Sequence, residues 1–332
     1  MNITMNRIDL SKMVVCLLVT MWQPADAFSM GHCPGSRKSA ISRYSPASLS
    51  ATKEEVLVSL NSVSNAVVSV ARRLGSDTLS GHKIVVAGAN GQTGRKILER
   101  LISSTTKFDV VGGVRNVNVA SSHMSKSMTV IRGARFEKID SVDLSAVTLR
   151  SMDVVRDSVD DLTTALKGTN TLVISIGFVT RFQMLGNPLA MKAAARAVDN
   201  IGTCKLVDAA KKAGVKRVVM LSSILANGRS WGQEGQPGFF VTNALGNVLD
   251  QKLIAETHLK TSGIDYTILR TGSLKTAPPT GTLGIFAEDT LNDGEISRDH
   301  VADAVVMCLA NSKYSKKVIE LKETRKQSEY YM

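Results

Sequence analysis

From residue 82 onward, short apolar runs alternate with longer segments in which apolar residues recur every three or four positions. The short runs fit buried strands, and the wider spacing fits helices with one buried face. The predicted strands span residues 83–87, 108–114, 152–156, 170–176, 216–222, 265–269 and 317–321. The predicted helices span residues 92–103, 159–167, 188–213, 243–262 and 298–310. This alternation predicts an α/β fold, a doubly wound and mostly parallel sheet with helices on both faces.

The same pattern divides the chain into segments. Residues 82–322 are expected to form one domain, followed by a tail at 323–332. The connection at 116–150 is longer than usual and is interpreted as an insertion of undetermined form. Before the domain, residues 54–80 read as a one-sided helix at 54–74 followed by a linker. Such a helix either packs against the domain or binds a membrane surface or a partner.

The N-terminal residues have the pattern of a targeting leader. In residues 1–27, two basic residues precede an apolar run at 13–21, and Ala-Asp-Ala at 25–27 fits the cleavage site of a signal peptide. Residues 28–53 contain many serines and no acidic residue, which is typical of a transit peptide. A signal peptide followed by a transit peptide resembles the bipartite leaders of algae with complex plastids. The leader therefore predicts a plastid location, with secretion as the alternative.

Composition narrows the function classes. The chain has 332 residues, is 43% hydrophobic and 21% charged, and carries a formal net charge of +12. Residues 1–53 hold +4 of that charge, and the remainder has neither a long basic run nor an aromatic–basic stripe. Nucleic-acid binding is therefore not expected. Beyond the leader only Cys204 and Cys308 remain, and their spacing fits neither a disulfide framework nor a metal site.

The strand predicted at 83–87 leads into a turn with three glycines, Gly88, Gly91 and Gly94, and then into a helix. The first glycine allows a tight turn, the second lets a diphosphate approach the backbone, and the third brings the helix close to the strand. Unpaired N–H groups and the helix dipole favour an anion at that point. Between a strand and a helix, this triplet predicts dinucleotide binding, against the alternative of a purely structural corner.

The end of the second predicted strand bears on the choice of cofactor. An NAD-preferring fold places Asp or Glu there for the ribose hydroxyls. Asp109 begins this strand, about 20 Å from Arg115 at its end. Arg115 is therefore positioned to pair with a 2′-phosphate, so NADP is favoured over NAD. The alternative is that Arg115 is a solvated surface residue.

Several further motifs, in sequence order, support the prediction of dinucleotide binding. Besides the glycine turn, the chain has Val-Arg-Asn at 114–116, Ala-Ala-Lys-Lys-Ala-Gly-Val-Lys-Arg at 209–217 and Asp-Tyr-Thr-Ile-Leu-Arg at 265–270. In these motifs the chain resembles the atypical short-chain dehydrogenase/reductases, within them the NAD(P)H-binding, NmrA-like and biliverdin-reductase-B-like branch common in plastids. The resemblance covers about residues 82–322. It implies an NAD(P)-binding Rossmann fold with small C-terminal elements on the substrate side.

The resemblance also implies a set of cofactor contacts, carried over by position. The diphosphate would lie on the turn formed by Gly88, Asn90, Gly91, Gln92, Thr93 and Gly94. Arg115 would meet the 2′-phosphate. The adenine loop is expected to use Asp157 or Ser158 with backbone groups of Val159. The nicotinamide end would lie near Gly177, Ser222, Ser223 and Lys252.

The best-known members of this superfamily use Ser, Tyr and Lys, the last two in the pattern Tyr-x-x-x-Lys. In this chain Lys252 is present, but Val248 stands at the tyrosine position. Ser223 and Lys252 are therefore the catalytic candidates, and ordinary alcohol dehydrogenation is not expected. Hydride transfer does not need the tyrosine, because a proton can come from solvent or substrate. His258 and His300 are expected to be surface or capping residues.

These observations favour a plastid NADP-binding reductase that transfers hydride from NADPH to an unidentified carbonyl or conjugated substrate. The alternative is a non-catalytic, NADP-sensing assembly, anchoring or regulatory protein within a plastid protein complex. Peripheral membrane association through residues 54–74 fits that alternative. The sequence predicts no metal site in either case.

Overall fold

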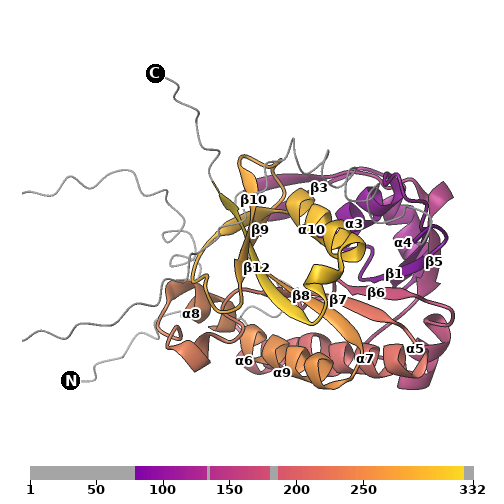
Figure 1. Ribbon diagram of the computed structural model, residues 1–332. Coiled ribbons are helices and arrows are strands. Elements are labelled where there is room, and N and C mark those ends of the chain that lie inside the picture. The colour runs from indigo at the N-terminus through magenta and orange to yellow at the C-terminus, as the bar shows by residue number, and fades with distance from the viewer. Residues whose placement is uncertain (1–78, 133–134, 180–185, 245, 325–332) are drawn as a thin grey trace, which may run out of the picture.

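The computed structural model describes residues 79–132, 135–179, 186–244 and 246–324 (Figure 1). The predicted signal peptide, transit peptide, helix at 54–74 and most of the tail lie outside these residues. The described chain forms an eight-stranded sheet in the order β10-β12-β8-β7-β6-β1-β2-β5. Its strands are β1 (Lys83–Ala87), β2 (Asp109–Val114), β5 (Thr148–Ser151), β6 (Thr171–Ile174), β7 (Arg217–Ser223), β8 (Asp265–Thr271), β10 (Thr282–Ala287) and β12 (Lys317–Thr324). Only the pairing of β10 with β12 is antiparallel in this sheet, which confirms the predicted fold class.

Helices cover both faces of the sheet (Figure 1). One face carries α3 (Gln92–Ile102), α4 (Val117–Met124) and α10 (Arg298–Ala310). The other carries α5 (Val159–Ala165), α7 (Thr203–Lys212) and α9 (Val248–Thr261). The remaining α-helices within the described residues are α6 (Pro188–Ala195) and α8 (Pro237–Ala244).

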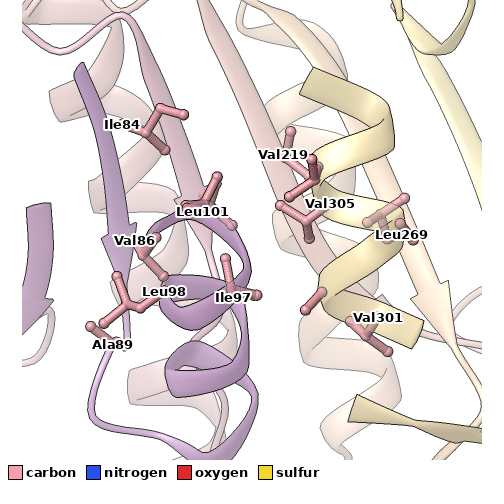
Figure 2. Close-up of a cluster of buried hydrophobic side chains, with 14 of the residues drawn as sticks. Ile84, Val86, Ala89, Ile97, Leu98, Leu101, Val219, Leu269, Val301 and Val305 are labelled. Carbon is pink, nitrogen blue, oxygen red and sulfur yellow. The ribbon is translucent and has the colours of Figure 1, made fainter. Parts of the chain in front are cut away.

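The side-chain alternation of β1 produces these two layers. Ile84 and Val86 pack with Ile97 and Leu98 of α3 in one core cluster, as Figure 2 shows. Val85 and Ala87 point to the opposite cluster, which is built from the other helices. Because both faces are covered, the strand reads as a continuous apolar run.

The chain reverses direction across the sheet at β1. From β1 it proceeds outward to β2 and β5, and then returns to β6 on the other side. Such a reversal leaves a crevice at the carboxyl ends of the two central strands, where open α/β sheets bind ligands. The glycine turn follows β1 directly, so the fold positions it beside this crevice.

The strand predicted at 152–156 is wrong, because the structure has β5 at Thr148–Ser151 instead. Among the described strands β5 pairs only with β2, at the edge of the sheet, which explains its mixed polar sequence. The apolar residues Met152 and Val154 that suggested a strand are buried in the following loop. There the Asp153 carboxylate accepts hydrogen bonds from the N–H groups of Val155 and Arg156, at 3.0 and 3.3 Å, and closes a turn.

Two long predicted helices are each divided. The helix predicted at 188–213 consists of α6, a π-helical segment η3 (Arg196–Gly202) and α7. The helix predicted at 243–262 begins only at Val248, after Gly246 and Asn247 adopt positive φ angles of 107° and 58°. A left-handed backbone at these positions separates α9 from α8.

The insertion at 116–150 contains α4, a hairpin of β3 (Met128–Arg132) and β4 (Arg135–Ile139), the 3-10 helix η1 (Leu144–Ala146) and β5. A second small sheet pairs β9 (Ser273–Lys275) with β11 (Glu295–Ser297) near the C-terminus. Two further 3-10 helices are η4 (Gly228–Trp231) and η5 (Ser312–Tyr314). Among the described residues, none of the helices has both the length and the apolar character needed to cross a bilayer.

Candidate functional site

The turn after β1 requires glycine at its first and third positions. Gly88 has a φ of 85°, and a Cβ there would lie 2.5 Å from the carbonyl oxygen of Ser175. A Cβ on Gly94 would collide with the carbonyl oxygen of Gly88, so α3 could not approach the turn. Both roles agree with the predictions from spacing.

Gly91 differs from the other two because it faces solvent. A Cβ there would meet only the Gly88 carbonyl oxygen, at 3.1 Å. α3 starts immediately afterward without a side-chain cap or an acidic residue in its first turn. The orphan N–H groups of such a helix start donate hydrogen bonds to an anion. The turn therefore fits the diphosphate of a dinucleotide, which Gly91 lets approach the backbone.

Asn90 sits inside this turn and is half-buried. Its Oδ1 accepts a hydrogen bond of 2.9 Å from Nη2 of Arg95, the first residue after Gly94. The side chain of Arg95 is only 3% exposed. No role was predicted for Arg95 from the sequence. The available signal was a charged residue at a position of α3 that must face the protein interior.

Arg115 follows the last residue of β2 and is exposed. It has no ion-pair partner among the described residues, while the next residue, Asn116, caps α4 by accepting from the Val119 N–H at 3.0 Å. Asp109 lies at the opposite end of β2, where its carboxylate is 3.2 Å from Nζ of Lys83. This arrangement leaves Arg115 as the charged residue at the carboxyl end of β2.

The predicted adenine loop lies after β5, but its residues have other contacts. The Asp157 carboxylate accepts from the Asp153 N–H at 2.7 Å. Ser158 is the N-cap of α5 and forms a capping box with Asp161, and Val159 is the first helical residue. Because β5 ends at Ser151, the residues nearest the sheet edge are Met152, Asp153 and Val154. The roles of Asp157, Ser158 and Val159 stay predictions.

A small pocket opens at the carboxyl ends of β6 and β7. Its polar lining consists of Ser222, Thr203, Asp199 and Lys252. Nζ of Lys252 lies 2.8 Å from Oδ1 of Asp199, whose side chain is fully buried. The other carboxylate oxygen of Asp199 accepts from the Phe178 N–H at 3.0 Å. Asp199 therefore joins α9 to the loop after β6.

Asp199 lies in the π-helical segment η3. Single π turns in helices concentrate at functional sites because they redirect one side chain. Asp199 was not predicted from the sequence, although an acid within an apolar helical pattern is the signal of a buried charge that needs a partner. Gly177 lies against the same pair, since a Cβ on it would be 3.8 Å from Nζ of Lys252.

The two serines at the end of β7 face opposite sides of the sheet. Ser222 lines the pocket, and its buried Oγ has no hydrogen-bond partner within the described chain. Ser223 is not part of the pocket lining. The tyrosine position, Val248, is the first residue of α9, one turn before Lys252. The structure thus brings together Ser222, Lys252 and Gly177, but not Ser223.

Loops after β7 are held over this edge by charged contacts. Arg229 of η4 pairs with both carboxylate oxygens of Asp250 on α9, at 3.0 and 3.2 Å. Nδ2 of Asn227 donates to Asp289, in the loop after β10, at 2.7 Å. These contacts fix the loop after β7 relative to α9 and to the loop after β10.

The two histidines differ from each other. His258 lies 2.7 Å from Asp208 on the helix surface, as expected. His300 is completely buried, contrary to the expectation of a surface or capping residue, and its Nδ1 lies 3.4 Å from Oε1 of Glu323. Burial lowers the pKa of His300. No group of His, Cys, Asp and Glu side chains among the described residues could hold a metal ion.

Comparisons with known proteins identify a family for this chain. A family model described as NAD(P)H-binding matches residues 88–312. An uncharacterised chloroplastic protein of Arabidopsis thaliana is 38% identical over 241 residues, which cover 72% of this chain and 76% of that protein. The chloroplastic Protein TIC 62 of Pisum sativum is 27% identical over 256 residues, 74% of this chain but only 44% of its own length.

A reductase and a solved structure are also similar. Sanguinarine reductase of Eschscholzia californica is 25% identical over 253 residues, 72% of this chain and 88% of that enzyme. The crystal structure of the oxidoreductase ylbE from Lactococcus lactis has a TM-score of 0.56 at 22% identity, covering 74% of this chain and 92% of its own. The chain belongs to the NAD(P)H-binding family.

Proposed function

We propose that this protein is an NADP-dependent reductase of a plastid, which transfers hydride from NADPH to a carbonyl or conjugated substrate. The observation that carries the proposal is the pocket beside the dinucleotide turn, where Lys252 is ion-paired to the buried Asp199 and Ser222 has an unpartnered hydroxyl. Polar groups that converge in a pocket at the carboxyl edge of an open sheet are typical of a reaction site.

In this proposal the cofactor supplies the hydride, and the protein supplies orientation. Asp199 holds one side of the Lys252 ammonium, which leaves further N–H donors for the hydroxyls of the nicotinamide ribose. Ser222 donates to, or accepts from, the reacting end of the substrate. Val248 carries no proton, so the proton comes from solvent or substrate.

Arg115 supports NADP as the cofactor. Its charge is exposed and unpaired within the described residues, at the strand end where the adenosine ribose lies in folds of this type. We expect Arg115→Ala to weaken NADPH binding about tenfold or more, because a charge-assisted contact to the 2′-phosphate is lost. NADH binding should stay the same. Calorimetric titration with both cofactors measures the difference, and equal losses for the two would remove Arg115 from this role.

Two observations support a plastid location. The chloroplastic relatives include the one at 38% identity, and the leader has the composition of a signal peptide followed by a transit peptide. A fluorescent fusion of residues 1–53 should enter plastids of an alga with complex plastids. Release of that fusion into the medium would favour secretion instead.

A non-catalytic NADP-sensing, anchoring or assembly role is the second candidate. It is favoured by Val248 at the tyrosine position and by the similarity to Protein TIC 62. Oxidation of NADPH by the purified protein in the presence of quinones, flavins or tetrapyrroles would establish the reductase. Cofactor binding without turnover, together with recovery of a stable complex from plastids, would establish the second candidate.

A further inference from the structure

Arg95 is a buried cation directly beneath the dinucleotide turn. Its side chain is 3% exposed, and its guanidinium donates three hydrogen bonds. Nη2 donates to Oδ1 of Asn90 at 2.9 Å, Nε to the backbone oxygen of Asn90 at 3.4 Å, and Nη1 to the backbone oxygen of Asp140 at 3.4 Å. Every acceptor is a neutral oxygen.

The charge of Arg95 therefore lacks a counterion within the described chain. Other arginines show the usual arrangement. Arg270 is equally buried, and Glu256 lies 2.8 Å from its Nη2. Arg100, on the same helix as Arg95, pairs with Asp303 at 2.8 Å. Burial lowers the pKa of Arg95, and Glu99 opposes this only in part. A buried cation without an anion is unfavourable, and an arriving phosphate would relieve that cost.

Arg95 also determines how the Asn90 side chain is oriented. A guanidinium only donates hydrogen bonds, so the amide must turn its oxygen toward Arg95. Nδ2 of Asn90 consequently faces the other way. It makes no hydrogen bond within the described chain, and it is not among the buried unpaired atoms, so it is open to solvent. An N–H donor is thus presented from the dinucleotide turn, where a phosphate or ribose oxygen would accept it.

We propose that Arg95 is a positioning residue of the dinucleotide site. It fixes the Asn90 amide with its N–H donor toward the phosphates of the cofactor, and those phosphates supply its missing counter-charge. The inference rests on the proposed binding of NADP in this turn. It assigns an electrostatic role to a side chain that lies below the turn rather than at its surface.

Two variants test this inference through opposite effects on stability and binding. In Arg95→Met the buried charge is gone, so the melting temperature of the cofactor-free protein should not fall. Its Kd for NADPH should rise about tenfold or more, because the fixed donor and the counter-charge are both lost. In Asn90→Asp a carboxylate faces Arg95, so the cofactor-free protein should melt at a higher temperature. Its Kd for NADPH should also rise, because the turn now repels phosphate.

Arg100→Met is the matched control, because it removes the same charge from the same helix. It should lower the melting temperature and leave the Kd within about twofold of the wild-type value, since Arg100 is paired with Asp303 away from the turn. If Arg95→Met does not fold, Arg95→Lys replaces it. Lysine keeps the charge but cannot hold both Asn90 oxygens, so the Kd should still rise severalfold.

Coupling between the two residues decides whether Arg95 acts through Asn90. The double variant Arg95→Met/Asn90→Ala should have the same Kd for NADPH as whichever single variant binds it more weakly. If the losses of binding free energy in the two single variants add up in the double variant, the positioning role is overturned. A lower melting temperature with unchanged Kd in Arg95→Met would make Arg95 purely structural. Parallel titrations with NADH identify the phosphate, because equal losses point to the diphosphate and a larger loss with NADPH to the 2′-phosphate. Wild-type protein that binds neither dinucleotide would overturn the proposed function itself.

Discussion

At the scale of single residues, the site depends on charges that are buried and need partners. Asp199 is fully buried and is satisfied by Lys252 and the Phe178 N–H. A buried ion pair contributes little net stability, but removing one member leaves the other uncompensated. The pair therefore fixes the Lys252 ammonium at one edge of the pocket, where a cofactor ribose would meet it.

We expect Lys252→Met to lower the free energy of unfolding by about 2–4 kcal/mol, because Asp199 stays buried without its cation. The double variant Lys252→Met/Asp199→Asn should regain part of that stability but not the affinity for NADPH. Urea unfolding and NADPH titration measure the two quantities separately. Asp208→Asn is the control. Because the contact of Asp208 with His258 is exposed, this variant should change the free energy of unfolding by less than about 0.5 kcal/mol. NADPH binding at wild-type strength in the double variant would exclude a cofactor role for Lys252.

His300 predicts a pH dependence of stability. Burial lowers its pKa below the ordinary value of 6.5, while Glu323 and Asp299 raise it and Lys275 lowers it. The unfolded chain therefore takes up a proton first as the pH falls. The stability that the neutral ring supplies is present above about pH 6.5 and is lost as the pH falls from there toward the lowered pKa.

The measurement is urea unfolding at a series of pH values between about 7 and 5. The slope of stability against pH in this range should be shallower for His300→Gln than for the wild type, by at most about 1.4 kcal/mol per pH unit. His258→Gln, at the helix surface, provides the comparison. An unchanged slope in His300→Gln would mean that the His300 ring is protonated or solvated in the folded protein.

At the scale of elements, the site is a strand–turn–helix unit with a second helix brought to it. β1 ends at Ala87, Gly88 turns the chain, and α3 begins at Gln92. The close approach at Gly94 holds the helix start beside the turn. On the other side of the crevice, the turn at Gly246 and Asn247 starts α9 one turn before Lys252. Both elements depend on backbone angles that glycine permits.

Alanine substitutions at two glycines with similar backbone angles distinguish the cost of a strained backbone from the cost of a steric clash. Gly168 has a φ of 71° and open space around it, whereas Gly88 has a φ of 85° and the Ser175 carbonyl oxygen against it. Gly168→Ala should cost about 1 kcal/mol of unfolding free energy, the cost of the left-handed backbone. Gly88→Ala should cost about 2 kcal/mol more, because the Cβ displaces the loop after β6. Chemical denaturation compares them, and equal costs would show that the turn accommodates a Cβ.

At the scale of the whole molecule, one buried arginine forms ion pairs with segments that are distant in sequence, near the carboxyl ends of the sheet strands. Arg270 on β8 contacts Glu256 of α9, Asp289 of the loop after β10 and Glu320 of β12, at 2.8, 2.6 and 3.5 Å. Glu320 also accepts hydrogen bonds from the N–H groups of residues 289–291. The last strand, the lysine helix and the loop that contacts Asn227 are therefore fixed together beside the pocket.

The sequence alone predicted the fold class, the dinucleotide turn and most of the elements around it. These features are local. The glycine spacing acts through the backbone angles and close contacts of neighbouring residues, and the apolar runs of β1, β6 and β7 reflect burial on both faces. The strand misplaced at 152–156 shows the limit, because edge strand β5 is defined by pairing with β2 rather than by its own pattern.

Only the tertiary structure decided which charged and polar side chains meet. Asp199 and Lys252 lie far apart in the chain, and the sequence does not indicate that η3 and α9 place them 2.8 Å apart. Likewise, the helical pattern directs Arg95 toward the interior, but only the packing shows that its partners are neutral oxygens. Local pattern determines which residues face inward, whereas the partner of a buried charge depends on the packing of whole elements. The sequence thus indicated that a dinucleotide is bound, and the packing decided which charged side chains lie at its site.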